Sequence, residues 1–162
     1  MAVYRAPMRS RRDDVAPLAA AARALELGLC GFGGVLRPPP AELAAAVVAA
    51  ERRHDVRLAR RIERFASVTA GSFAWTRDGT DRYWLGRIDG PYFYDARSGA
   101  ETVDLVHVRA CEWVVSAVPD GDVPAAVIAT FGRGGRNFQQ THAPGVDSES
   151  LRVWNQRTEF SR

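Results

Sequence analysis

In residues 72–95, SFAWTRDGTDRYWLGRIDGPYFYD, apolar and polar side chains alternate, and two Asp-Gly pairs interrupt the alternation. A period of two predicts β-strands, because successive side chains of a strand point to opposite faces of its sheet. The Asp-Gly pairs at 78–79 and 89–90 are typical of tight turns between strands. We therefore expect strands at 72–77, 82–88 and 92–95, as the start of a meander of about five strands that closes on an earlier strand.

Apolar runs on both sides of this meander complete the expected sheet. Leu29 to Leu36 is apolar and glycine-rich, which predicts a strand whose backbone another chain or a ligand approaches closely. Further strands are expected at 103–108, 111–118 and 137–141. Spacing and helical propensity predict peripheral helices over 13–28, with its start at Asp13–Pro17, over 41–48 and over 54–65, a short one starting near Asp122, and a closing one over 149–160. The pattern predicts an α+β fold built on a small mixed curved β-sheet or barrel of about five to six strands.

The length of 162 residues fits one domain. We expect residues 1–12 to be a disordered basic N-terminus and residues 13–162 to form a single domain. Cys30 and Cys111 lie in apolar stretches and are expected to be buried, reduced thiols, which favours a cytoplasmic location. No run approaches the roughly 18 apolar residues of a membrane span, so a membrane is not an expected partner.

All 22 basic residues are arginines, and the net charge is +3. Arginine suits phosphate recognition, but lysine-free, alanine-rich chains are also common in GC-rich genomes, so composition alone does not decide. The arginine face expected over 53–64 is by default a solvated face, with phosphate binding as a second interpretation. The loop GRGGR at 132–136 is more specific. Its glycines would let backbone amides approach phosphate beside Arg133 and Arg136, and Asn137 and Gln139 would add base-reading amides.

Aromatic residues are concentrated in the meander, where seven of the chain's 15 lie between Phe73 and Tyr94. A single ring is by default part of the interior, but not all seven fit inside a small sheet, so some are expected to line a pocket. Rings of this kind can clamp a flat base by stacking, each contributing about 1–3 kcal/mol. We predict a base-binding pocket formed by Trp75, Trp84, Tyr92, Tyr94 and Trp113.

Catalytic and metal-binding patterns are weak. A zinc site needs four converging ligands, and His107 with Cys111 has no second close Cys/His pair to join it. A Cys–His nucleophile needs an exposed thiol, whereas Cys111 stands beside Trp113 in an apolar stretch. The carboxylates are scattered. We therefore expect no cofactor, no metal and no enzymatic activity.

Two segments, YWLGRIDGPYFYD (83–95) and HVRACEW (107–113), resemble the PUA-like modules of EVE type that stand at the front of modification-dependent restriction endonucleases. GSFAW (71–75) is similar to the strand that precedes these motifs, with Ser72 where Asp is usual, and Cys111 is a second departure. The similarity spans about residues 25–141. It implies a mixed α/β barrel that holds a flipped or unpaired modified base in an aromatic pocket.

These observations predict a non-catalytic reader of nucleic acid, with DNA expected in preference to RNA, that binds a modified base such as a methylated one. Arg109, Arg133, Arg136, Asn137 and Gln139 would contact the nucleic acid. The resemblance implies a role in restriction or phage defence, beside a separately encoded effector protein. Two alternatives stay open on the same fold: a small-molecule or nucleotide sensor, and a protein-interaction module with a filled barrel.

Overall fold

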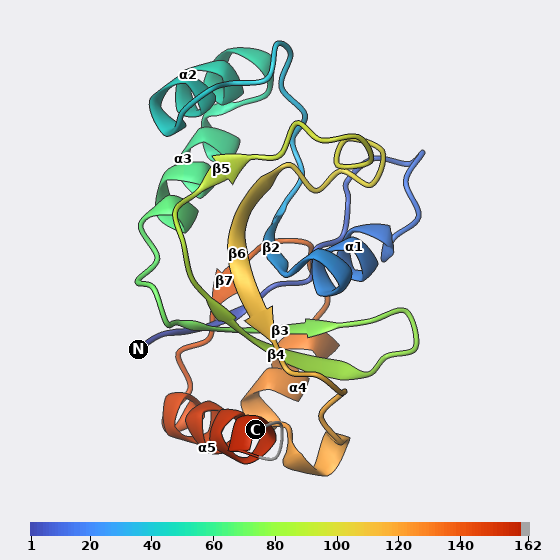
Figure 1. Cartoon of the computed structure of the whole chain (residues 1–162), viewed down its shortest axis with the longest axis vertical. Coiled ribbons are helices and arrows are strands. Elements are labelled where there is room, and N and C mark those ends of the chain that lie inside the picture. Colours follow the sequence, from blue (N-terminus) through green and yellow to red (C-terminus); the bar gives the residue numbers. More distant parts are fainter. Residues whose placement is uncertain (160–162) are drawn as a thin grey trace.

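The computed structural model of the chain describes residues 1–159 and contains one mixed sheet that curls into a half-barrel (Figure 1). The strand order is β2-β6-β4-β3-β1-β7, and β5 pairs with β6 beside this path. The strands are β1 (Val3–Arg5), β2 (Leu29–Phe32), β3 (Phe73–Arg77), β4 (Tyr83–Ile88), β5 (Phe93–Tyr94), β6 (His107–Trp113) and β7 (Gln139–Gln140).

Helices surround the sheet: α1 (Ala19–Leu27), α2 (Leu43–Arg53), α3 (Val56–Ala66), α4 (Ala125–Gly132) and α5 (Val146–Glu159), with a 3-10 turn at Asp120–Asp122. In Figure 1, α2 and α3 lie at one end of the half-barrel, and α4 and α5 lie at the other. The predicted α+β architecture, a small curved sheet with peripheral helices, is confirmed. The last residue expected in the closing helix, Phe160, lies outside the described residues.

The first two strands of the expected meander pair as predicted, but the next strand, β5, pairs with β6 and not with β4. β3 and β4 are antiparallel, with Phe73 opposite Arg87 and Arg77 opposite Tyr83. The Asp78 carboxylate closes the turn by accepting hydrogen bonds from the backbone of Thr80 and the indole of Trp84, both at 2.8 Å. Partial burial raises the pKa of Asp78, but these hydrogen bonds outweigh it and lower the pKa to about 2.

The two strands expected at 103–108 and 111–118 are a single strand, β6, flanked by loops. Arg109 and Ala110, at the expected break, pair with Cys30 and Leu29 of β2. β6 continues to Trp113, which lies opposite Gly86 of β4. Polar residues within β6 obscure the alternation of apolar and polar side chains in this strand. The apolar residues that precede β6 are buried although they lie in a loop.

Part of the N-terminal segment belongs to the sheet, whereas residues 1–12 as a whole are expected from sequence to be disordered. Val3–Arg5 forms β1, which pairs in parallel with β3 and antiparallel with β7. Val3, Ala6 and Met8 are buried, so apolar side chains between the basic residues anchor this segment in the sheet. Four of the first twelve residues are arginines, and they interrupt the apolar pattern of the segment.

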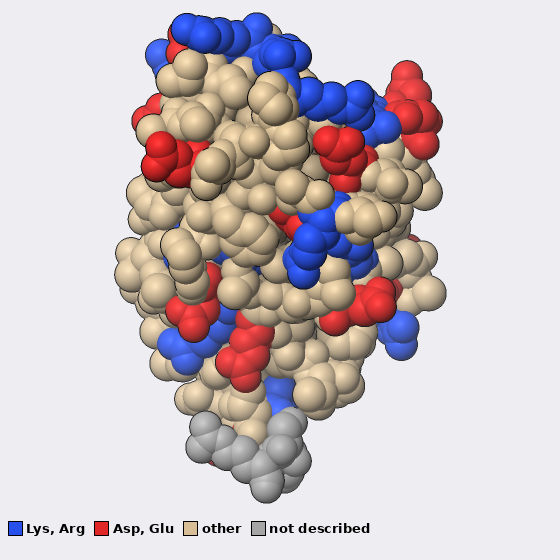
Figure 2. All heavy atoms as spheres, turned by 45° about the horizontal axis from the view of Figure 1, so that its top comes forward, with Lys and Arg blue, Asp and Glu red and all other residues tan. Residues whose placement is uncertain are grey.

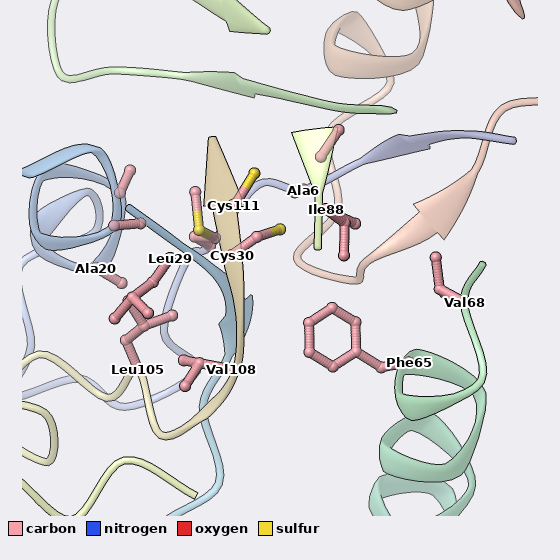
Figure 3. Close-up of a cluster of buried hydrophobic side chains, with 14 residues drawn as sticks. Ala6, Ala20, Leu29, Cys30, Phe65, Val68, Ile88, Leu105, Val108 and Cys111 are labelled. Atoms are coloured by element: carbon pink, nitrogen blue, oxygen red, sulfur yellow. The ribbon is translucent and has the colours of Figure 1, made fainter. Parts of the chain in front are cut away.

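One of three buried clusters joins α3 to the sheet, and Figure 3 shows its side chains. Phe65, at the end of α3, points toward the strands that carry Cys30, Val108 and Cys111. Both cysteines are free and buried, as predicted, and burial raises the pKa of the Cys111 thiol. Burying Phe65 contributes about 2–3 kcal/mol, which fixes α3 against the sheet.

Candidate nucleic-acid interface

A cleft of about 270 Å³ opens between residues 9–12, the loop after β2 and helix α3. Its apolar floor includes Phe32 and Leu58, and Gly33 and Gly34 form one wall. We call it the arginine cleft because five guanidinium groups line it, those of Arg9, Arg11, Arg12, Arg61 and Arg136.

The wall at Gly33 and Gly34 is built by close contacts within the chain. A Cβ on Gly33 would lie 2.3 Å from the Asp104 carboxylate, and Gly34 has a φ of +123°, which favours glycine. Asp104 accepts hydrogen bonds from the Gly34 backbone at 3.0 Å and from the Ser10 hydroxyl at 2.6 Å. The close approach that the glycines of this region predicted is therefore made by Asp104, which ties the loop to the N-terminal segment.

His107 holds Gly34 of this wall by a hydrogen bond. Its Nε2 lies 2.8 Å from the carbonyl oxygen of Gly34, which can only accept, so Nε2 carries the proton. Its Nδ1 then accepts from the Tyr92 hydroxyl at 2.7 Å. Burial lowers the pKa of His107 to about 4, so the imidazole is neutral near pH 7 and acts as a fixed structural link.

Arginines that lack acidic partners face the cleft. Arg11 and Arg61 both donate to Oδ1 of Asn137, at 2.5 and 2.9 Å. Burial lowers the pKa of Arg61, and the nearby charge of Arg11 lowers it further. Among residues 1–159, the recorded ion pairs involve Arg12, Arg23, Arg37, Arg77, Arg82 and Arg97, and none involves Arg9, Arg11, Arg61 or Arg136.

The wider surface carries both signs of charge. On the face shown in Figure 2, arginine side chains gather at the upper end of the molecule, with acidic side chains among and below them. The charge on this face therefore does not single out a binding surface. The arginine cleft differs because four of its five arginines have no recorded ion pair with a carboxylate among residues 1–159.

A second hollow of about 550 Å³ adjoins the cleft and shares Phe32 and Arg61 with it. We call it the aromatic hollow. Tyr4 and Phe138 stack there, with ring centroids 4.6 Å apart and planes 13° apart. Phe138 meets Phe65 edge-on at 5.0 Å, and Phe65 meets Phe32 in the same manner at 5.2 Å. Amide side chains also line the hollow, namely those of Asn137, Gln139 and Gln140.

Buried Arg5 holds the loop that follows α4. Its guanidinium donates to the carbonyl oxygens of Thr130 and Gly134, each at 2.9 Å, and to Oε1 of Gln139 at 3.0 Å. Burial lowers the pKa of Arg5, and the charge of Arg133 adds to this. Arg5 therefore fixes the glycine-rich loop 132–136 on β1 and places Arg136 at the cleft.

The structure does not bring the five expected pocket rings into one site: Trp84 and Trp113 line one surface depression together, but the other three rings do not line it. Trp75 is fully buried on the sheet face toward α5, and its indole donates to Ser150 at 3.1 Å. The Trp113 indole donates to the carbonyl of Leu29 at 3.0 Å. None of the five lines the arginine cleft or the aromatic hollow. Trp84 binds Asp78, Tyr92 binds His107 and Tyr94 binds the backbone of Leu36, so each polar tip has a structural partner.

The expected nucleic-acid contacts divide into three groups. Arg109 is buried and donates to the carbonyl oxygens of Gly90, Phe65 and Val68, which occupies its guanidinium with backbone. Arg136, Asn137 and Gln139 lie at the two hollows. Arg133 is exposed but faces a different depression, beside His142.

Sequence reasoning missed the four rings of the aromatic hollow and the convergence of Arg11 with Arg61. Tyr4, Phe32, Phe65 and Phe138 come from four segments that only the fold brings together. The one local signal in the sequence is the arginine-rich face of α3, whose default interpretation is a solvated face. Arg61 is the member of that face that turns into the cleft.

A scan of the chain against protein-family models found no match, and a search of curated proteins found none either. The resemblance to PUA-like modules of EVE type therefore stays a prediction. Within residues 1–159, no helix is long and apolar enough to cross a membrane. In the same part of the chain, His, Cys, Asp and Glu side chains form no group of three that could hold a metal ion.

Proposed function

We propose that this protein binds nucleic acid without catalysing a reaction, with phosphates in the arginine cleft and one unpaired base in the aromatic hollow. The observation that carries the proposal is the adjacency of these two sites, which share Phe32 and Arg61. A nucleotide has the same two parts, an anionic phosphate and a flat apolar ring, joined by a short sugar. Phosphate contacts would set affinity, and contacts to the base would set specificity.

The charge arrangement supports the phosphate part of the proposal. Guanidinium groups already paired with carboxylates would have to break those pairs to bind phosphate. Arg9, Arg11, Arg61 and Arg136 have no such pair among the described residues. A phosphate oxygen would therefore gain charge-assisted hydrogen bonds, which are about twice as strong as neutral ones.

The ring arrangement supports the base part. An unpaired base stacked against Phe32 or Phe138 would gain about 1–3 kcal/mol, which helps to offset the cost of taking it out of a duplex. The side-chain amides of Asn137 and Gln140 lie at the same hollow and can read base edges. A methyl group on the base would add apolar surface for these rings to cover, in line with the modified base that the family resemblance implies.

Binding to matched oligonucleotides tests the proposal. The set is unmodified DNA, 5-methylcytosine, 5-hydroxymethylcytosine and N6-methyladenine, each single- and double-stranded and each at two salt concentrations. We expect binding that weakens steeply with salt, because bound phosphates release counterions, and tighter binding to one modified form. Absence of binding to every oligonucleotide would overturn the proposal, and equal affinity for all forms would remove the modified base from it.

The rings and side-chain amides that line the aromatic hollow beside Arg61 favour one second candidate, a sensor of a free nucleotide. About 550 Å³ lies within the range of about 300–1,000 Å³ found for small-molecule sites. A sensor would bind a mononucleotide saturably and with little dependence on salt, and would bind an oligonucleotide no more tightly.

A further inference from the structure

The side chains around the arginine cleft leave it with an excess of positive charge. Four guanidinium groups without ion pairs and two carboxylates line the cleft. The fifth arginine, Arg12, is left out of this sum because its charge is neutralised by its ion pair with Asp14. The cleft therefore carries two positive charges more than negative ones. The contributing residues are Arg9, Arg11, Arg61, Arg136, Asp55 and Asp104.

Both carboxylates are already used by the fold. Asp55 caps α3 by accepting from the Leu58 backbone at 2.8 Å, and Asp104 accepts from Gly34 and Ser10. Neither carboxylate forms an ion pair with a cleft arginine among the described residues. The excess positive charge of the arginines is therefore not neutralised by these carboxylates and is available to an anion in the cleft.

Asn137 marks the point where this charge converges. Its single oxygen Oδ1 accepts from both Arg11 and Arg61, and it is neutral. The Nε of Arg61 is buried without a hydrogen-bond partner among the described residues. An anionic oxygen at the same point would neutralise both guanidinium groups, which the amide cannot do.

We propose that the arginine cleft binds a phosphate monoester dianion, which takes the place of the Asn137 amide oxygen between Arg11 and Arg61. A monoester carries a charge of about −1.5 to −2 near neutral pH, which matches the excess of two positive charges. An internal phosphodiester carries only one negative charge and leaves the cleft unbalanced. The inference deepens the proposed function, on which it rests: the strand would enter by its phosphorylated end, with its terminal base in the aromatic hollow.

A phosphate monoester has two sources, the end of a strand and a free mononucleotide. The probes are one short single-stranded oligonucleotide with a 5′-phosphate, a 5′-hydroxyl, a 5′-methyl phosphodiester or a 3′-phosphate, together with the matching nucleoside 5′-monophosphate. We expect one phosphorylated end to bind about tenfold more tightly than the 5′-hydroxyl and 5′-methyl phosphodiester forms, because the dianion gains charge-assisted hydrogen bonds. Mononucleotide binding as tight as that of the phosphorylated strand would assign the site to the free ligand.

Three variants connect the preference to the cleft. Arg9→Ala removes an exposed cleft arginine, and Arg61→Ala removes a convergent one; both should abolish the tenfold preference. Asn137→Asp would put a permanent carboxylate between Arg11 and Arg61 and should also abolish it, without removing any arginine. The matched control is Arg152→Ala, at an exposed position of α5 at the other end of the molecule, and it should keep the tenfold preference.

The outcomes separate this inference from the proposed function. Equal binding of all four end groups would overturn the monoester site and leave nucleic-acid binding intact. Binding of none of the oligonucleotides and not of the mononucleotide would overturn both. A preference for one phosphorylated end that Arg9→Ala, Arg61→Ala and Asn137→Asp all retain would place the site elsewhere and contradict the assignment to the cleft.

Discussion

Arg11 and Arg61 donate hydrogen bonds to the same amide oxygen, that of Asn137, at 2.5 and 2.9 Å. Two like charges held this close repel each other unless an anion joins them. The contact links three segments of the chain, the N-terminal residues, α3 and the loop before β7. It also lies where the arginine cleft and the aromatic hollow meet, since Arg61 lines both.

Phe138 tests the aromatic hollow. Phe138 is only partly buried, and it stacks on Tyr4 at the hollow. Phe138→Ala should weaken oligonucleotide binding by about 1–3 kcal/mol, the contribution of one stacked base, and leave the dependence on salt unchanged. Val115→Ala, at a site that is 78% exposed and does not line the hollow, is the control. Fluorescence anisotropy measures both, and an unchanged affinity for Phe138→Ala would exclude its ring from the base site.

Trp75 tests whether the meander rings belong to the core. Trp75 is fully buried and packs in the cluster that includes Phe73 and Trp154. Trp75→Ala should lower the free energy of unfolding by about 3–5 kcal/mol, the cost of removing a large buried ring. Chemical denaturation measures the loss. A stable Trp75→Ala variant that has lost binding to a modified base would restore the pocket that the sequence predicted.

Arg109 and Arg136 separate a structural arginine from a binding one. Arg109→Gln should destabilise the fold by at least about 2 kcal/mol, because three backbone carbonyls lose a charged donor. Arg136→Gln, at an exposed site, should leave stability unchanged and weaken oligonucleotide binding. Thermal unfolding and binding, measured on both variants, should give opposite patterns; the same pattern in both would contradict the assignment.

His107 predicts how stability depends on pH. Its pKa falls from 6.5 to about 4 in the folded protein, so the unfolded chain binds a proton that the folded chain rejects. The contribution of His107 to the free energy of unfolding is therefore fully present above about pH 6.5. It is lost as the pH falls toward 4, by about 3 kcal/mol in total. His107→Gln should be less stable at pH 7 but show a shallower loss over this window. An equal slope in both proteins, followed by urea denaturation, would show that His107 titrates normally.

The local parts of the fold were predictable from sequence, and the long-range parts were not. The alternation over residues 72–95 predicted β3 and β4 correctly, and Gly28 ends α1 with a φ of +70°, as a helix-terminating glycine should. Alternation also placed Phe73 and Trp75 on one face. It could not tell that this face is buried under α5, because helices cover both ends of the half-barrel.

The candidate site was less predictable because distant segments form it. Arg11, Gly34, Arg61 and Arg136 belong to four parts of the chain, and none is part of a motif with fixed spacing. Arg109 shows the converse problem: in sequence it resembles a phosphate contact, yet the curl of the sheet turns it toward the backbone of Phe65 and Val68. Burial, which sequence does not supply, distinguishes the two kinds of arginine.

The dependence of oligonucleotide affinity on salt, measured for the wild-type protein and for Arg61→Ala, tests the central claim most directly. If the arginine cleft holds phosphate, affinity for the wild type falls steeply with salt, and Arg61→Ala weakens binding and lowers the slope of log K against log salt by about 1. Arg152→Ala should keep the wild-type slope. A wild-type affinity that does not change with salt, or an Arg61→Ala slope equal to that of the wild type, would contradict the claim.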